Sequence, residues 1–198
     1  MNGTDNIKGS TFVALIVAAL CASPRPTSAQ PYATVAAGIA LNSIDCSDTT
    51  FPTCEKTDIA VKVIGGYRVA PWIAGEAVYL DFGEGLKSSR FAEDTMKSSG
   101  FGGGVAFHGN VASWMVTARF GAARAAATRT ATLGQQIIAD ATFTDVAPYG
   151  GVAIGYRFSD YVALALGFDA MRSKWERSDG LGWTWIATAA TAGVTIGR

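Results

Sequence analysis

His108 is the only histidine in the chain, and histidine is the side chain best suited to acid–base chemistry near neutral pH. A hydrolase built on a histidine, a serine and an acid would need these groups close together. Gly109 and Asn110 follow His108 directly, so no serine stands two residues further on. We therefore predict that the chain has no catalytic residues and is not an enzyme.

Five charged residues share one face of the extended segments that carry them. Successive side chains of a strand point to opposite faces, and each of these charges falls on the face opposite the bulky apolar residues. The five are Lys62, Glu76, Arg119, Arg157 and Asp169. Opposite charges on one enclosed face predict a network of salt bridges. A charged pore constriction and a catalytic dyad are the alternatives.

Two cysteines, Cys46 and Cys54, stand close together in a polar segment. In an oxidising compartment such a pair predicts a disulfide that closes a small loop. A bridge of this size stabilises a fold by roughly 2–3 kcal/mol on a chain-entropy estimate. A metal site is the weaker interpretation, because no histidine lies nearby, and we expect neither a metal nor another cofactor.

These residues lie on, or between, segments in which bulky apolar and small or polar residues alternate. The alternation predicts eight strands, each long enough to cross a membrane at a tilt. Their predicted bounds are Tyr32–Leu41, Asp58–Val69, Trp72–Phe82, Ser99–Gly109, Ser113–Ala123, Thr144–Arg157, Tyr161–Arg172 and Thr184–Ile196. Pro148 lies inside the sixth strand and cannot donate to a ladder, so we interpret it as the strand's entry near the loop side, where a bulge is tolerable.

The gaps between the predicted strands alternate between long and short. Those at 70–71, 110–112 and 158–160 are a few residues each, whereas the others are polar and glycine-bearing and include the predicted loops 83–98 and 124–142. An even number of antiparallel strands with short turns on one side and long loops on the other is typical of outer-membrane barrels. The fold class predicted is therefore an all-β, eight-stranded, antiparallel up-and-down transmembrane β-barrel.

Composition agrees with a barrel whose alternate residues face lipid. Hydrophobic residues make up 49% of the chain and charged residues only 16%. No run of about 18 apolar residues follows residue 29, so no spanning helix is expected. The net charge of zero and the lack of a basic stripe argue against a nucleic-acid partner.

Aromatic residues gather at both ends of the predicted strands, where amphipathic rings favour the membrane interface. The predicted interface set is Tyr67, Trp72, Trp114 and Tyr161 beside the short turns, and Trp183 and Trp185 beside the long loops. The simpler alternative is that aromatics are good strand formers.

The N-terminus has the pattern of a secretory signal peptide. Lys8 precedes an apolar run from Phe12 to Ala22, and small residues follow up to Ala29. Such a run is too short to span a membrane, which needs about 20 apolar residues. We predict cleavage after Ala29, a signal peptide at 1–29, a barrel domain at 30–198, and Sec-type export to the bacterial outer membrane.

One hairpin resembles that of a known family. The segment Gly66-Tyr67-Arg68-Val69-Ala70-Pro71-Trp72 is followed by Ala74, Glu76, Tyr79, Asp81 and Gly83 at the spacing Ala-x-Glu-x-x-Tyr-x-Asp-x-Gly. This pattern is similar to the second hairpin of OmpA-like outer-membrane barrels, and 155–160 echoes it. The resemblance implies a monomer with four surface loops, in which Glu76 pairs with basic residues inside the barrel.

The same resemblance implies a structural or surface role. Expected partners are outer-membrane lipid and lipopolysaccharide, the barrel-assembly machinery, and a host or surface ligand bound through the loops. Relatives of this kind usually end on an aromatic residue, whereas this sequence ends Val194-Thr195-Ile196-Gly197-Arg198, which puts assembly efficiency in question. The alternatives are a small-solute pore, a soluble lipocalin-like ligand-binding barrel, and an outer-membrane enzyme that modifies lipid A.

Overall fold

The computed structural model describes residues 30–43, 46, 52–134, 136–176 and 182–197. The predicted signal peptide, residues 1–29, lies outside these ranges. No helix within them is long and apolar enough to cross a membrane. The strands are β1 (Gln30–Asn42), β2 (Thr53–Glu55), β3 (Thr57–Ala70), β4 (Ile73–Ser88), β5 (Ala92–Val111), β6 (Trp114–Leu133), β7 (Gln136–Arg157), β8 (Val162–Glu176) and β9 (Gly182–Gly197).

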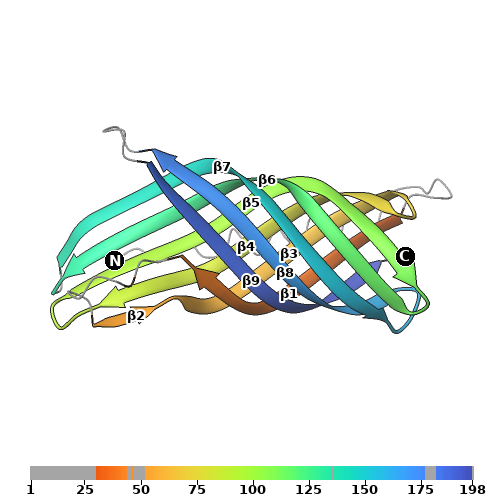
Figure 1. Cartoon of the computed structure of the whole chain (residues 1–198), viewed down its shortest axis with the longest axis horizontal. Coiled ribbons are helices and arrows are strands. Elements are labelled where there is room, and N and C mark those ends of the chain that lie inside the picture. The colour runs from red at the N-terminus through yellow and green to blue at the C-terminus, as the bar shows by residue number, and fades with distance from the viewer. Residues whose placement is uncertain (1–29, 44–45, 47–51, 135, 177–181, 198) are drawn as a thin grey trace, which may run out of the picture.

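The strands form one antiparallel sheet that closes on itself. From β3 to β9 each strand pairs with the next, and β1 pairs with both β3 and β9, where Tyr32 stands opposite Gly197. The three-residue β2 pairs with the far end of β4 and so extends the line of β3. Eight long strands therefore make the wall, as predicted, and Figure 1 shows them tilted around the barrel.

Burial alternates along each strand and shows which face points inward. In β8, Leu164, Leu166 and Phe168 are exposed, while Ala163 and Asp169 on either side of them are buried. Many bulky apolar residues of the other strands also point outward, including Ile39, Val61, Phe101, Val116, Phe120, Val152 and Val194. An apolar belt of this extent suits lipid rather than water. The predicted faces are confirmed, and the soluble lipocalin-like alternative, which hides its bulky face, is wrong.

Glycines on the inner face make room for two tyrosine rings. Tyr32 stands opposite Gly66 in the β1–β3 ladder, and its ring occupies the space that a Cβ on Gly66 would need. The Tyr149 ring lies in the same way over Gly104 and Gly121. Small residues beneath large ones allow a narrow barrel to fill its interior, as eight-stranded barrels generally do.

Two of the predicted long loops are largely strand. β4 and β5 are joined by residues 89–91, and β6 ends at Leu133 before β7 begins at Gln136. The prediction of loops at 83–98 and 124–142 is wrong because strand ends were placed where the lipid-facing apolar alternation stops. Backbone pairing does not require that alternation, and it continues through polar residues. Figure 1 shows β5, β6 and β7 reaching beyond the rest of the wall.

Side-chain pairs reinforce these extended hairpins. Arg129 of β6 donates two hydrogen bonds to the Asp94 carboxylate of β5, at 2.8 and 2.7 Å. That carboxylate raises the pKa of the Arg129 guanidinium above its ordinary value. Thr128 and Thr142 are hydrogen-bonded across the β6–β7 pair at 3.1 Å. Cross-strand pairs of this kind stabilise a sheet by a few tenths of a kcal/mol up to about 1 kcal/mol each.

Irregularities occur where the chain changes direction or register. Ala112 begins the tight β5–β6 turn with a positive φ of 53°, which is unfavourable for a residue with a Cβ. Gly83, with φ 65°, lies in a bulge of β4, where Glu84 N–H donates to Asp58 at 2.7 Å. Pro148, predicted at the entry of its strand, lies well inside β7, and no register shift occurs there. Pro148 stays in register with Ala122, just beyond the β7–β8 ladder that begins at Tyr149, while the β6–β7 irregularity lies near Ala131.

Candidate functional site: the charged interior and its vestibule

Four of the five predicted charges meet inside the barrel, and we refer to Lys62, Glu76, Arg119 and Asp169 as the lumenal network. Arg119 Nε donates to Glu76 Oε2 at 3.1 Å, and Arg119 Nη1 lies 3.7 Å from Asp169 Oδ1. Lys62 Nζ pairs with Asp169 Oδ2. None of the four residues is more than 7% exposed. Two cations and two carboxylates thus neutralise one another out of contact with solvent.

Strand register places these groups together. Arg119 of β6 stands opposite Gly151 of β7, and Gly151 stands opposite Asp169 of β8. A Cβ on Gly151 would meet the Asp169 carboxylate, so the glycine is what allows that side chain to lie flat across β7 toward Arg119. Glu76 of β4 lies between Gly66 and Gly104 of its neighbouring strands, with similar freedom.

Three further polar residues are linked to the lumenal network. They were not predicted from the sequence as its partners. Tyr32 OH donates to Glu76 Oε1 at 2.5 Å and lies 3.3 Å from His108 Nε2. His108 Nδ1 lies 3.1 Å from Thr117 Oγ1. The lumenal parity placed His108 and Thr117 on the inner face. For Tyr32 the available signal was its parity, which it shares with Thr34, Ala36 and Gly38 of the same strand.

Arg157 is the predicted network member that the structure places elsewhere. It has the inward parity but stands at the end of β7, where its side chain is exposed and donates to the Ala112 carbonyl at 3.3 Å. Parity predicts only which face of the strand a side chain occupies. Its position along the barrel axis determines whether the side chain is buried in the interior. Arg157 is therefore a residue of the short-turn rim.

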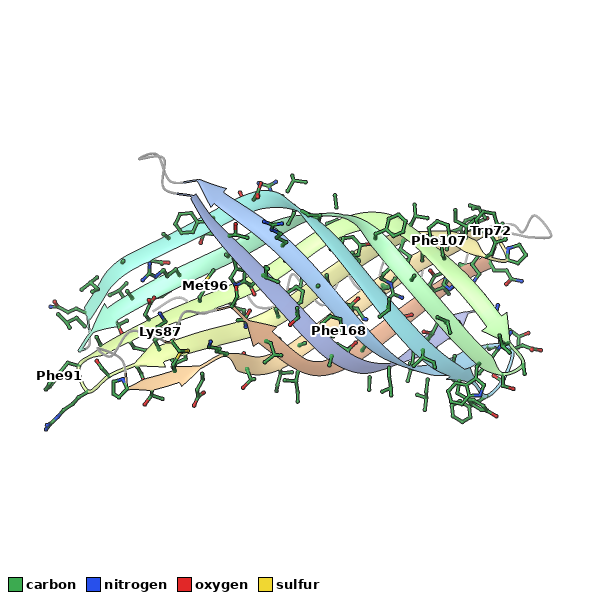
Figure 2. The ribbon with its side chains drawn as sticks, in the orientation of Figure 1. Trp72, Lys87, Phe91, Met96, Phe107 and Phe168 are labelled. Carbon is green, nitrogen blue, oxygen red and sulfur yellow. A yellow bond between two sulfur atoms is a disulfide. The ribbon has the colours of Figure 1, made fainter. Side chains whose placement is uncertain are left out.

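The interface aromatics beside the short turns all lie on the outer surface. Tyr67, Trp72, Trp114 and Tyr161 are between 36% and 57% exposed. The Trp72 ring stacks on Phe107, with centroids 6.1 Å apart, and Figure 2 shows the two together at the short-turn end, opposite the end that carries Phe91.

The two tryptophans predicted at the loop side behave differently. Trp185 is only 6% exposed and packs edge-on against Phe82 inside the barrel, with ring centroids 6.2 Å apart. Its prediction as an interface residue is wrong, because it shares the inward parity of Ala187 and Ala189. The side chain of Trp183 lies outside the described part of the structure.

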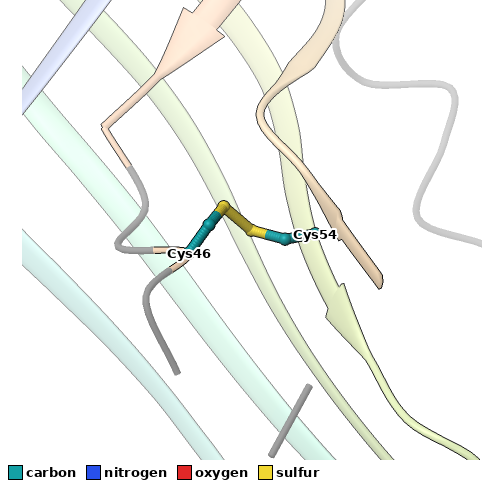
Figure 3. Close-up of a disulfide and its surroundings, with 2 residues drawn as sticks. All are labelled: Cys46 and Cys54. Atoms are coloured by element: carbon teal, nitrogen blue, oxygen red, sulfur yellow. A yellow bond between two sulfur atoms is a disulfide. The ribbon is translucent and has the colours of Figure 1, made fainter. Parts of the chain in front are cut away.

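Cys46 and Cys54 form the predicted disulfide, shown in Figure 3. Their Cα atoms are 5.9 Å apart, within the range usual for disulfides. Cys46 follows β1 and Cys54 lies in β2, so the bridge ties the β1–β3 connection to the strand that extends β3 along β4.

Two cavities adjoin the lumenal network. A small one of about 20 Å³ lies within the interior and touches Lys62, Arg119 and His108. A larger one of about 270 Å³ lies at the short-turn end, and we call it the vestibule. Tyr32, Arg68 and Met115 line both and so separate them.

These groups pair their charges and form hydrogen bonds with one another. His108 is buried on the inner face and lies within hydrogen-bond distance of Tyr32 and Thr117. Within the described ranges, no three His, Cys, Asp or Glu side chains gather as a metal ion would require.

Solved structures with the same fold are small outer-membrane proteins. Neisserial surface protein A has a TM-score of 0.55 at 12% identity, covering 84% of this chain and 96% of its own. Ail, the attachment invasion locus protein of Yersinia pestis, in complex with the heparin analogue sucrose octasulfate, has a TM-score of 0.55 at 9% identity, covering 87% and 100%. At these identities the likeness shows the fold alone. No curated protein sequence matches the chain.

The model of the outer membrane protein beta-barrel domain matches residues 12–195. That span includes β1 to β8, β9 as far as Thr195, the lumenal network and both cysteines. The outward apolar belt, the closed ring of tilted strands and the short turns at one end agree with it. The chain belongs to the outer membrane protein beta-barrel domain family.

Proposed function

We propose that this protein is a monomeric, non-enzymatic surface barrel of the outer membrane, reached by Sec-type export, whose extended hairpins contact the cell's surroundings. The observation that carries the proposal is a contrast between the two parts of the molecule. The interior is filled by its own side chains, whereas β5, β6 and β7 continue beyond the lipid-facing belt and present exposed residues.

The filled interior supports a structural role over a small-solute pore. The lumenal network spans β3, β4, β6 and β8, and the cavity beside it has a volume of only about 20 Å³. Moving a buried ion pair apart is costly, since each charge would be left without its partner in a low-dielectric interior. A conducting state would have to break these pairs.

The extended hairpins support a contact role. Large apolar side chains are exposed at their tips, among them Phe91, Leu133, Ile137 and Ile138, each more than half exposed. Charges of both signs lie below them, including Glu93, Lys97 and Arg124. A mixed surface of this kind suits an amphipathic partner. Lipopolysaccharide is the first candidate, because it is a component of the same membrane. A host surface molecule is the second candidate.

The test compares the intact protein with a variant whose β6–β7 hairpin is shortened by replacing residues 128–142 with Asn-Gly. Both would be folded in nonionic detergent, checked for a heat-dependent gel shift, and titrated with purified lipopolysaccharide. We expect saturable binding by the intact protein and at least tenfold weaker binding by the variant. Equal binding by both would contradict the contact role of the hairpin.

Conductance in planar bilayers distinguishes the surface barrel from a small-solute pore. The surface-barrel proposal predicts no steady single-channel steps from the intact protein, and a pore predicts steps that grow when Arg119 is replaced by alanine. Release of fatty acid from lipid A by the purified protein would contradict the non-enzymatic proposal directly.

A further inference from the structure

The vestibule at the short-turn end brings together two arginines from distant parts of the chain. Arg68 comes from β3 and Arg157 from the end of β7, and both line this space of about 270 Å³. Ser159 and Asp160 of the β7–β8 turn line it too, as does Asn110 near the end of β5. The vestibule therefore has polar groups from three separate connections of the barrel.

The Arg68 guanidinium has few hydrogen-bond acceptors around it. Its Cζ lies 5.2 Å from the centroid of the Tyr32 ring, and its Nη2 lies 3.9 Å from the Met115 sulfur, which is a weak acceptor. Its Nε is buried and has no hydrogen-bond partner in the described part of the chain. A buried donor left unpaired is unfavourable, particularly on a charged group.

Charge balance differs between the lumenal network and the vestibule. The network matches two cations with two carboxylates. In the vestibule two guanidinium groups face a single carboxylate, that of the exposed Asp160. Among the residues that the structure describes, neither Arg68 nor Arg157 forms an ion pair, and Arg157 donates only to a backbone carbonyl. The vestibule thus carries an excess of positive charge.

Ser159 adds a donor suited to an anion. Its Oγ accepts hydrogen bonds from the backbone N–H groups of Tyr161 and Val162, both at 3.2 Å. Those two bonds occupy the oxygen as an acceptor and leave its own O–H to donate. Two guanidinium groups, from β3 and the end of β7, and a hydroxyl of the β7–β8 turn line one cavity and suit a tetrahedral oxyanion with several acceptor oxygens.

We propose that the vestibule is a binding site for a phosphate group, held by Arg68, Arg157 and the Ser159 hydroxyl. The Arg68 Nε, which has no partner among the described residues, is the donor from which the phosphate accepts a hydrogen bond. By the convention of such barrels the short turns face the periplasm, so the group comes either from inorganic phosphate or from the headgroup of a phospholipid in the inner leaflet. Both present the same acceptor oxygens.

The experiment titrates the protein, folded in octyl glucoside micelles, by isothermal calorimetry. One arm uses inorganic phosphate and the other a short-chain phosphatidylglycerol. Arg68→Gln and Arg157→Gln each remove one guanidinium, and Arg124→Gln, an exposed arginine on β6 away from the vestibule, is the matched control. We expect saturable binding that each vestibule variant weakens about tenfold, the cost of one charge-assisted contact, and that the control leaves unchanged.

The two arms identify the source of the phosphate. Binding of inorganic phosphate supports a free-anion site, and saturable binding of the lipid alone supports a headgroup site. Absence of saturable binding in both arms would overturn the proposal, as would an equal loss in the Arg124→Gln control or equal displacement by chloride. Arg157 is exposed at the rim, so its variant keeps the test valid even if Arg68→Gln fails to show the heat-dependent gel shift of a folded barrel.

Discussion

Glu76 accepts hydrogen bonds on both carboxylate oxygens, one from Tyr32 and one from Arg119. The two donors come from β1 and β6, so a single side chain on β4 joins three positions around the barrel. Buried ion pairs add little net stability compared with a well-packed apolar core, but the loss of one partner is expensive because the other charge remains buried. Stability should therefore depend strongly on the charge of Glu76.

Glu76→Gln should lower the free energy of unfolding by about 3 kcal/mol. The substitution keeps the shape of the side chain but removes the charge that faces Arg119, and it turns one acceptor into an NH₂ group that meets a donor. Urea unfolding of the refolded barrel, followed by tryptophan fluorescence, measures the change. Glu84→Gln, at an exposed position of the same strand, should stay within about 0.5 kcal/mol of the unchanged protein. Equal stability of both variants would mean that the lumenal network does not support the fold.

For single residues, the sequence predicted the face of the strand better than the position along the barrel axis. The alternation of side chains along each strand placed four charges on the inner side, because a charge on the lipid side would be costly: Lys62, Glu76, Arg119 and Asp169. It could not show that Arg157 lies above the covered interior, or that Trp185 turns toward Phe82. Both depend on height along the axis and on strand tilt, which alternation does not encode. The Tyr32–Glu76 bond depends on the β1–β3 register, which is equally hidden.

At the scale of elements, the β5–β6 turn contains a strained residue. Ala112 adopts a positive φ of 53°, in the left-handed region that costs an L-residue roughly 1–2 kcal/mol relative to right-handed backbone. Glycine has no Cβ and reaches the same conformation without that clash. It loses some stability through the greater conformational freedom of the unfolded chain, but this loss is smaller than the strain. The turn is two residues long, Ala112 and Ser113, so neighbouring residues have little room to relieve the strain.

Ala112→Gly should raise the free energy of unfolding by up to about 1 kcal/mol. The control is Ala118→Gly, within β6 and outside the turn, where glycine removes a strand side chain and should lower stability by about 0.5 kcal/mol or more. Paired urea titrations distinguish the two signs. A loss of stability in both variants would show that the turn holds no strain that glycine relieves.

The element boundaries show where patterns stop being informative. At the short turns the predicted and observed strand ends agree within a few residues, because Pro71 and the 158–160 segment interrupt pairing by their own chemistry. At the other end the ladders shift register at Gly83 and near Ala131, but pairing resumes after each shift. Pairing runs on through Thr128 and Thr130 without an apolar face, and only Gly134, with φ 62°, marks the β6–β7 reversal.

At the scale of the whole molecule, the apolar belt makes the barrel a membrane protein. Leu166 is 64% exposed on β8, next to Ile154 and Ala192 on the neighbouring strands, near the middle of the belt. Ile138, although 61% exposed, lies on the part of β7 that extends past the belt. The two residues are alike in type and exposure but differ in the solvent they meet.

Leu166→Arg should destabilise the barrel in lipid vesicles by about 2–4 kcal/mol, because the charge would face hydrocarbon at mid-membrane. Ile138→Arg should cost no more than about 0.5 kcal/mol, since an exposed site outside the belt meets water. Folding titrations in vesicles, scored by the heat-dependent gel shift, measure both. Equal costs would show that the belt does not mark the lipid-facing zone.

The pairing of β1 with β9 has a consequence for how the molecule reaches its native state. Tyr32 and Gly197 stand opposite each other although nearly the whole barrel separates them along the chain. Until that last ladder forms, the sheet has two open margins with free N–H and C=O groups, which invite pairing with other chains. Contacts so distant in sequence also form slowly. We expect the unfinished barrel to be the aggregation-prone species, and its time in that state to decide how much protein a cell can assemble.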